Sequence, residues 1–380
     1  MKYSGILRIG YKLLVNDRAK FSALLVGITF SVFLMMQMTA MFAGILNRAY
    51  STVTNVGAPM WIIDPAVNTP TIAIPLPDYL LDAVRSMQQV EYAVPVFIGS
   101  AQVRLENGTY QGVSVIGLDD TSLLGRPALE QGAIEDIYAE NAFIVVHDAE
   151  FAKLGNPAIG TSFELNDHRG IIVGIARVLV GGLTGVPTLY TTYRRAIEYI
   201  PTTRFTVSYI LLKPRSRQGE AAIKQQVARL GYIALTRDEF NRRIADFYIY
   251  QTGVGTNILM MTIISFLVGL SISGQTFYSF ILENLDKFAA LKAIGAKNRE
   301  MVYMIFFMAM FTAMTGYGLG IGLVTLMIVI ARTCLPNYAA IVTFWNLGLA
   351  FGLVLLIAGF SSYLGIRKVL KIEPFDIFRG

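Results

Sequence analysis

The sequence predicts an α-helical membrane protein with four transmembrane helices and a large α+β extracytoplasmic domain inserted between the first and second helices. Composition is the first observation: of 380 residues, 54% are hydrophobic and only 15% are charged, whereas a soluble domain carries about 25% charged residues. The other two are four charge-free runs and a stretch of soluble composition, residues 47–246, between the first two runs. This composition disfavours a cytosolic enzyme and a disordered protein.

Each charge-free run is long enough to cross a bilayer, which takes about 20 consecutive apolar residues in a helix. The runs cover residues 21–46, 247–282, 301–331 and 333–366. We therefore expect transmembrane helices at 21–46, 251–282, 301–331 and 344–366. The first run is longer than the roughly 7 to 15 apolar residues of a signal peptide, so we expect an uncleaved anchor.

Lysine and arginine residues fall almost entirely on one side of these spans. The N-terminal segment 1–20, the loop 283–300 and the tail 367–380 hold 13 of them, whereas the short external loop 332–343 holds only Arg332. By the positive-inside rule, both termini are expected in the cytoplasm. The net charge of +6 then reflects a basic collar attracted to the anionic lipid bilayer, and we expect no nucleic-acid partner.

The extracytoplasmic domain with its stalk is expected at residues 47–250. Residues 92–105 and 110–118 are rich in β-branched side chains and are separated by a turn that contains Asn107-Gly108, a strong β-hairpin signal. Further strands are expected at 142–147, 170–180 and 205–213, and helices at 77–88 and 218–230. The single cysteine, Cys334, allows no internal disulfide.

A capping box is predicted just before the second span, with Thr236 at the cap and Glu239 three residues later. It would begin a helix that runs through Phe240, Ile244 and Phe247 into the membrane. A continuous helix would be a rigid stalk that carries displacement across the bilayer. A helix that ends near the lipid headgroups is equally consistent with the sequence.

Four glycines alternate with other residues inside the third run: Gly316, Gly318, Gly320 and Gly322. With no preceding strand, they favour two interleaved G-x-x-x-G faces for helix packing over a nucleotide-binding loop. No Walker A sequence is present. His147 and His168 have no partners at metal-ligand spacing, so we expect no metal site and no catalytic site.

The loop 283–300 between the second and third spans carries an amphipathic pattern. Its apolar residues recur every three positions and predict a short helix: Leu285, Phe288, Leu291 and Ile294. Its polar candidates for contact with a partner are Glu283, Lys287 and Lys292. Gly295 suits the left-handed position that ends a helix. Such a helix can lie in the headgroups or bind in a groove of a partner.

The sequence from Leu291 to Ala296, Leu-Lys-Ala-Ile-Gly-Ala, resembles the corresponding loop of the FtsX/MacB family of ABC transporter permeases. The four spans, the large domain after the first span and the ending Pro374-x-Asp-Ile-Phe378 agree with this resemblance. Within the family, the chain is most similar to DevC-type permeases.

The resemblance implies a non-catalytic permease subunit of an ABC exporter in the bacterial inner membrane. A second permease copy would complete a dimer, and a separate ATPase subunit would bind ATP, so this chain needs no cofactor and no fused ATPase domain. The helix in loop 283–300 would be the coupling helix that contacts the ATPase through the residues named above. ATP hydrolysis would move the outside domains, with a periplasmic adaptor and an outer-membrane duct, for efflux of a hydrophobic, lipid-like or drug-like substrate.

Two other functions fit the same topology. An FtsX-like protein would transmit ATPase motion to periplasmic cell-wall enzymes without transporting a substrate. A receptor is disfavoured, because the cytoplasmic segments of 20, 18 and 14 residues hold no signalling domain. An adaptor bound to the outside domain would favour export, whereas a bound wall hydrolase would favour regulation.

Overall fold

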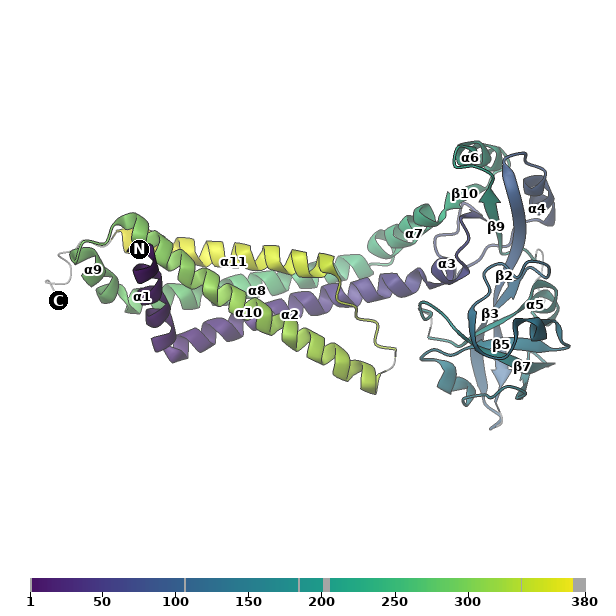
Figure 1. The fold of residues 1–380 in the computed structure, drawn as a ribbon, viewed down its shortest axis with the longest axis horizontal. Coiled ribbons are helices and arrows are strands. Elements are labelled where there is room, and N and C mark those ends of the chain that lie inside the picture. Colours follow the sequence, from purple (N-terminus) through teal and green to yellow (C-terminus); the bar gives the residue numbers. More distant parts are fainter. Residues whose placement is uncertain (1, 106, 184, 201–205, 336, 372–380) are drawn as a thin grey trace. The chain divides into compact units, whose positions relative to one another are not determined.

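The computed structural model describes residues 2–105, 107–183, 185–200, 206–335 and 337–371 (Figure 1). The chain divides into two compact units, one formed by Met1–Gly44 with Val254–Gly380 and the other by Ile45–Gly253. The ending predicted to match the family, Pro374 to Phe378, lies outside the described residues.

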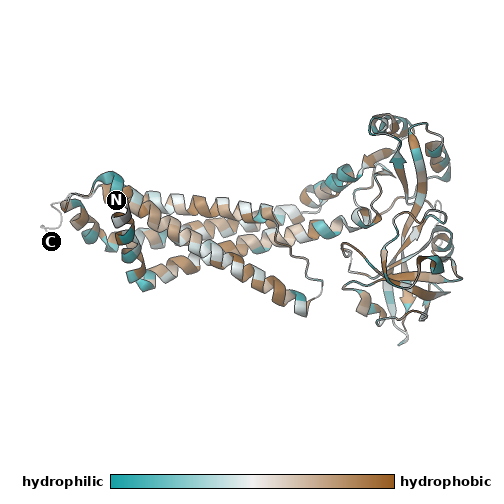
Figure 2. Ribbon diagram, in the orientation of Figure 1, coloured by the Kyte–Doolittle hydropathy of each residue, from teal (hydrophilic) through white to brown (hydrophobic). Residues whose placement is uncertain are grey.

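The regular secondary structure described in the first unit is helical. Its helices are α1 (Lys2–Asn16), α2 (Arg18–Ala49, which continues into the second unit), α8 (Val254–Glu283), α9 (Leu285–Ala293), α10 (Asn298–Cys334) and α11 (Phe344–Leu370). Among the described residues, α2, α8, α10 and α11 are long and apolar enough to cross a membrane. Figure 2 shows hydrophilic residues gathered where α1 and α9 lie, at one end of these helices. The four predicted spans are thus present as helices.

The four long helices pack side by side around a buried apolar core. Val32 of α2, Val324 of α10 and Ile357 of α11 belong to this core. Hydrogen bonds between helices supplement the packing, as is common for polar side chains in membranes. Ser31 Oγ donates to the Ser265 carbonyl of α8 at 2.9 Å, so α2 and α8 are joined directly.

The second unit is a mixed α+β domain built on a ten-stranded sheet. Its strands are β1 (Met60–Ile63), β2 (Val90–Arg104), β3 (Tyr110–Leu118), β4 (Ala128–Gln131), β5 (Ala142–Val146), β6 (Ser162–Leu165), β7 (His168–Arg177), β8 (Thr188–Thr192), β9 (Tyr209–Pro214) and β10 (Ile233–Thr236). The strand order is β10-β1-β9-β2-β3-β8-β5-β7-β4, and β6 pairs with β2 and β7. Its helices are α3 (Ser51–Val56), α4 (Asp78–Arg85), η1 (Ile134–Tyr138), η2 (Phe151–Leu154), α5 (Tyr193–Tyr199), α6 (Gly219–Arg229), α7 (Arg237–Asp246) and the π-helical η3 (Phe247–Gln251).

The long strand β2 links the two halves of this sheet. Its first half, from Val90 to Val96, pairs with β9, and its second half, from Phe97 to Arg104, pairs antiparallel with β3. The second pairing confirms the hairpin predicted around Asn107-Gly108. The strands that the sequence did not indicate include β1 and β8, which are buried almost throughout. Strands buried on both faces lose the alternation that identifies half-exposed strands.

Of the two alternatives for the stalk, the continuous helix into the second span does not form. α7 passes into the π-helical η3, and the backbone at Gly253 then adopts a left-handed conformation with φ 74° before α8 begins. Two hydrogen bonds close the last turn: Thr252 N–H donates to the Phe247 carbonyl and Thr252 Oγ1 donates to the Tyr248 carbonyl. Glycine tolerates a left-handed backbone at little cost, which is why it commonly ends helices.

Candidate functional site

The candidate site is α9, the short helix between the second and third membrane-type helices. Only Asn284 separates it from α8, and this side chain is buried. Asn284 Nδ2 donates to the Phe280 carbonyl at 2.8 Å, and Asn284 Oδ1 accepts from Lys287 Nζ at 2.7 Å. These bonds tie the last turn of α8 to the first turn of α9, so the start of α9 is fixed.

The C-terminal end of α9 is fixed by a Schellman motif. The Ala296 N–H donates to the Leu291 carbonyl at 3.0 Å, and the Gly295 N–H donates to the Lys292 carbonyl at 3.1 Å. Gly295 has φ 102°, a left-handed value that a residue with a Cβ adopts only with strain. Both ends of α9 therefore have defined geometry.

The apolar side of α9 faces the chain's own core. Phe288 is fully buried in a cluster to which every helix of the first unit contributes, including Leu14 of α1, Met304 of α10 and Val369 of α11. Leu285 and Leu291 are partly buried against the same cluster. The expectation that Phe288 belongs to the ATPase-docking face must therefore be corrected, because its side chain is used for packing within the chain. Leu285 and Leu291 keep part of their surface exposed, and their role in docking stays a prediction.

The three predicted polar contacts are also engaged within the chain. Glu283 forms an ion pair with Lys20 of α2. Lys292 Nζ donates to the Leu370 carbonyl at 3.4 Å, at the negative end of the α11 dipole. Lys287 bonds to Asn284 as described, and both Lys287 and Glu283 stay exposed, so these two of the three side chains are placed to meet a partner.

The opposite side of α9 is exposed, and we call it the outer face of α9. It consists of Asp286, Lys287, Ala290, Ala293, Ile294 and Lys297. The two alanines leave room for a partner's backbone to approach closely, and Ile294 is 85% exposed. Interfaces commonly depend on a few large apolar anchors surrounded by polar residues. The outer face has this composition.

A hollow of about 590 Å³ borders the outer face. Tyr11 and Lys12 of α1, Arg18 of α2 and Lys287 line it. Three cations from three helices favour an acidic partner surface here. Among the described residues there is no group of three or more His, Cys, Asp or Glu side chains that could hold a metal ion.

The two predicted glycine faces of α10 have different surroundings. A Cβ on Gly316 would lie 2.7 Å from Ile28, and one on Gly320 would lie 2.6 Å from Val32, both on α2. Gly318 and Gly322 meet nothing within 4 Å. Residues two apart on a helix point in nearly opposite directions, so one face packs against α2 and the other is open.

The predicted stalk cap has both hydrogen bonds of a capping box. The Glu239 N–H donates to Thr236 Oγ1 at 3.4 Å, and Glu239 Oε2 accepts from the Thr236 N–H at 2.9 Å. Lys224 Nζ contacts both Glu239 carboxylate oxygens, at 2.6 and 2.7 Å. The carboxylate therefore joins α6 to the start of α7.

The contacts of Glu239 predict a pH-dependent contribution to stability. Burial raises the pKa of Glu239, but the bonds from Lys224 and from Thr236 outweigh it and leave the pKa below its usual value. Because the pKa of Glu239 is lower in the folded protein, its ionised carboxylate stabilises the fold at pH values above the unfolded pKa of about 4.3. This stabilisation is lost as the pH falls through the pKa of the folded protein. Solvent screening of this exposed pair keeps the effect to about 1 kcal/mol or less.

We expect Glu239→Gln to lose less stability than wild type when the pH is lowered, because the variant has no carboxylate to protonate at this position. Thermal unfolding of the full-length protein, recorded at neutral pH and at a pH below the usual glutamate pKa, measures it. Asp238→Asn changes an exposed acid of the same turn and serves as the control. Equal pH dependence in wild type and Glu239→Gln would contradict the assigned ion pair.

Two family models match the chain. The MacB-like periplasmic core domain matches residues 22–230, more than half of the chain, and the FtsX-like permease C-terminal model matches residues 259–374, which include all of α9. The chain belongs to the FtsX/MacB family of ABC transporter permeases. The predicted resemblance is thereby confirmed at the family level, and the narrower similarity to DevC-type permeases stays a prediction.

Two relatives of this permease are described as ABC transporter permeases. Two uncharacterized ABC transporter permeases, from Mycobacterium tuberculosis strains CDC 1551 and H37Rv, are each 23% identical to it over 357 residues, which cover 90% of this chain and 92% of the relative. Among solved structures, it is similar to the extracellular domain of the noncanonic ABC-type transporter YknZ from Gram-positive bacteria (12% identity, 47% of this chain, 99% of that chain, TM-score 0.36). It is also similar to the periplasmic region of MacB from Actinobacillus actinomycetemcomitans (15% identity, 50% of this chain, 93% of that chain, TM-score 0.37).

Sequence reasoning missed two parts of the permease site. Tyr11 and Lys12 of α1 were expected only as part of a basic segment, although they line the hollow beside α9. Lys20 was counted as a collar residue, although it pairs with Glu283. Opposite charges at the ends of two predicted spans were the available signal, but pairing them requires knowledge of which spans are neighbours.

Proposed function

We propose that this permease is the membrane-spanning subunit of an ABC exporter, which couples ATP hydrolysis in a separate ATPase subunit to efflux of a hydrophobic, lipid-like or drug-like substrate. The exposed outer face of α9 supports this proposal most directly. It offers an ATPase a small apolar surface next to a basic hollow. ATP is bound by the partner, since the sequence has no Walker A motif.

The packing of α9 supports transmission of the ATPase's movement to the membrane helices. Phe288 contributes to a core shared with α1, α2, α8, α10 and α11. Protein interiors are packed like solids and pass on strain rather than absorb it. A push on the outer face of α9 would therefore displace all of these helices together.

The proposal places the permease in the bacterial inner membrane, with the α9 side in the cytoplasm. The distribution of lysine and arginine supports this orientation. We propose two permease copies per complex, together with a periplasmic adaptor that leads to an outer-membrane duct. The permease itself would hold no cofactor.

Replacing the apolar anchor of the outer face tests the ATPase contact. We expect Ile294→Asp to weaken ATPase binding about 30-fold, the effect of losing an interface hot spot of about 2 kcal/mol. Because Ile294 is 85% exposed, the fold should be unaffected. Affinity is measured between the ATPase and full-length permease in lipid nanodiscs.

Leu335→Asp provides the matched control, because Leu335 is also exposed (61%) and lies at the opposite end of α10 from α9. We expect this variant to bind the ATPase as wild type does. Equal affinity for Ile294→Asp and wild type would contradict docking on the outer face.

A pull-down of tagged permease in mild detergent distinguishes export from regulation. Mass spectrometry of the bound proteins is expected to identify an ATPase together with a periplasmic adaptor. An ATPase found with a cell-wall hydrolase instead would favour the FtsX-like regulator, in which the same α9 contact drives a periplasmic enzyme. Absence of any ATPase, under conditions that preserve such complexes, would contradict both functions.

A further inference from the structure

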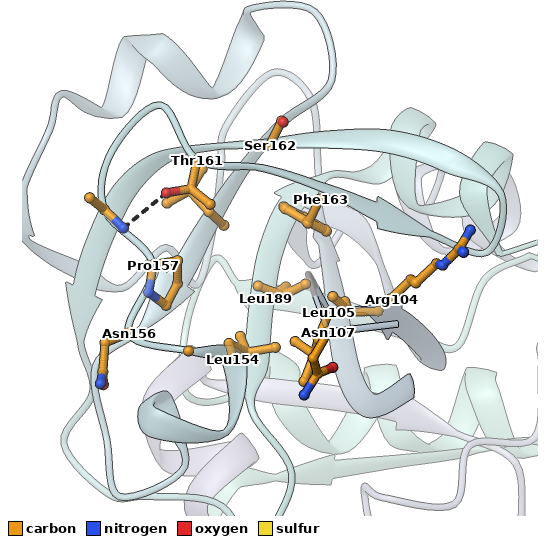
Figure 3. A pocket seen from close by; sticks show the side chains of 14 residues that line it. Arg104, Leu105, Asn107, Leu154, Asn156, Pro157, Thr161, Ser162, Phe163 and Leu189 are labelled. Atoms are coloured by element: carbon orange, nitrogen blue, oxygen red, sulfur yellow. Dashed lines mark hydrogen bonds between the residues drawn. The ribbon is translucent and has the colours of Figure 1, made fainter. Parts of the chain in front are cut away.

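The second unit contains a pocket that neither α9 nor the stalk uses. It has a volume of about 440 Å³ and lies between the end of β2, the end of η2 and β6 (Figure 3). Pockets for small molecules typically have volumes of about 300–1,000 Å³. The pocket is therefore large enough for a small ligand.

The floor of the pocket is apolar. Val103, Ile172 and Leu189 line it and are buried. Figure 3 shows Leu105, Leu154 and Leu189 gathered around the same space. Water has no hydrogen-bond partners on such a floor, so an apolar body that displaces it gains free energy.

The rim of the pocket is polar and nearly free of uncompensated charge. Asn107, Asn156 and Thr161 lie along it. The charged rim residue, Arg104, is paired with Glu164 at 3.4 Å, and Figure 3 shows its guanidinium turned away from the leucines. Asn107 Oδ1 already accepts from the Thr109 N–H at 2.9 Å and from Thr109 Oγ1 at 2.6 Å, which leaves the Asn107 amide N–H groups to donate, while the Asn156 amide can donate and accept. They therefore suit a neutral polar group better than an ion.

The loop that forms one wall is held in place without a ligand. The Gly160 N–H donates to the Ile172 carbonyl at 2.7 Å, and the Ile172 N–H donates to the Thr161 carbonyl at 2.9 Å. The Ala158 N–H donates to Thr161 Oγ1 at 3.1 Å. A wall that is already ordered lowers the entropic cost of binding.

We propose that this pocket binds a small neutral amphiphile. Its apolar body would lie on Val103, Ile172 and Leu189, and its hydroxyl, amide or ester group would bond to Asn107 and Asn156 at the rim. Binding itself does not depend on ATPase coupling. The further step, that the bound molecule belongs to the transported class, rests on the proposed exporter function.

Photolabelling of the full-length permease in lipid nanodiscs tests the pocket. The probe is dodecanol carrying a diazirine, and labelled peptides are identified by mass spectrometry. We expect labelling within residues 103–107 and 154–163 that unmodified dodecanol suppresses. Labelling confined to the membrane helices would overturn the proposal.

Two exposed alanines give a matched pair of variants. Ala158 lines the pocket and Ala152 of η2 does not. We expect Ala158→Trp to block the entrance and reduce pocket labelling about tenfold, equivalent to about 1.4 kcal/mol, whereas Ala152→Trp should label as wild type does. Equal labelling of Ala158→Trp and wild type would contradict binding in the pocket.

Two further measurements test whether the ligand is neutral and whether its binding is independent of the ATPase contact. Diazirine-bearing dodecanoic acid is expected to label the pocket more weakly than the alcohol, and equal or stronger labelling would overturn the assignment of a neutral ligand. In Ile294→Asp, pocket labelling should persist although ATPase binding is lost. Loss of pocket labelling in that variant would contradict the claim that the pocket binds its ligand independently of the ATPase. If wild type binds its ATPase but its pocket is not labelled, the pocket proposal is overturned and the exporter proposal is not.

Discussion

Phe288→Ala is expected to lower the free energy of unfolding of the permease by about 3–5 kcal/mol, the usual cost of truncating a buried aromatic side chain. Phe288 is fully buried and its core includes side chains from all six helices of the first unit. Removing the ring leaves a cavity at the point where α9 is attached. Thermal unfolding in one detergent, followed by circular dichroism, measures the loss.

The same variant should separate binding from coupling. The outer face of α9 is unchanged in Phe288→Ala, so the ATPase should still bind at a temperature where the variant is folded. The movement of the ATPase should then be transmitted to the membrane-spanning helices less effectively than in wild type. Ile294→Ala is the control for stability: an exposed side chain should change it by no more than about 0.5 kcal/mol. If Phe288→Ala unfolded with the same free energy as wild type, the assignment of Phe288 to the core would be contradicted.

Gly320→Leu is expected to destabilise the permease by about 3 kcal/mol or more, because overpacking a close contact forces the backbone to move. Even a Cβ at this position would lie 2.6 Å from Val32 and 3.1 Å from the Thr29 carbonyl oxygen of α2. The backbone oxygen cannot turn aside as a flexible side chain would. α10 and α2 would have to separate, which thermal unfolding and the yield of folded protein report.

Gly322→Leu makes the same chemical change two residues further along α10. Nothing lies within 4 Å of the position where its Cβ would be placed, and leucine favours a helix more than glycine does, by about 1 kcal/mol. We expect its stability to equal or exceed that of wild type. Equal destabilisation by Gly320→Leu and Gly322→Leu would show that α10 does not present the two faces as described.

The spans and the hairpin could be predicted from sequence because each has a local cause. A charge-free run of sufficient length requires a helix in lipid, and Asn107-Gly108 supplies the backbone conformations that a tight hairpin needs. The capping box at Thr236 and Glu239 is likewise local. The sequence could not reveal the interruption at Gly253, because a glycine inside an apolar run is compatible with a continuing helix.

The orientation of α9 could not be predicted for a geometric reason. A helix turns by about 100° per residue, so a repeat of three drifts by about 60° at each step. Across nine residues, from Leu285 to Ile294, the drift places the two side chains on opposite sides. Phe288 then faces the chain's own core and Ile294 faces solvent. An apolar pattern does not distinguish a chain's own core from a partner.

The interruption at Gly253 makes the two chain connections between the units different in backbone structure. α2 enters the second unit as an unbroken helix that ends at Ala49, whereas the return connection passes through the left-handed Gly253 between η3 and α8. Each turn of a helix is hydrogen-bonded to the next, whereas a glycine with a left-handed φ interrupts that series of bonds. The chain therefore leaves the first unit inside a hydrogen-bonded helix and returns to it through a residue that has no Cβ and stands outside a helix.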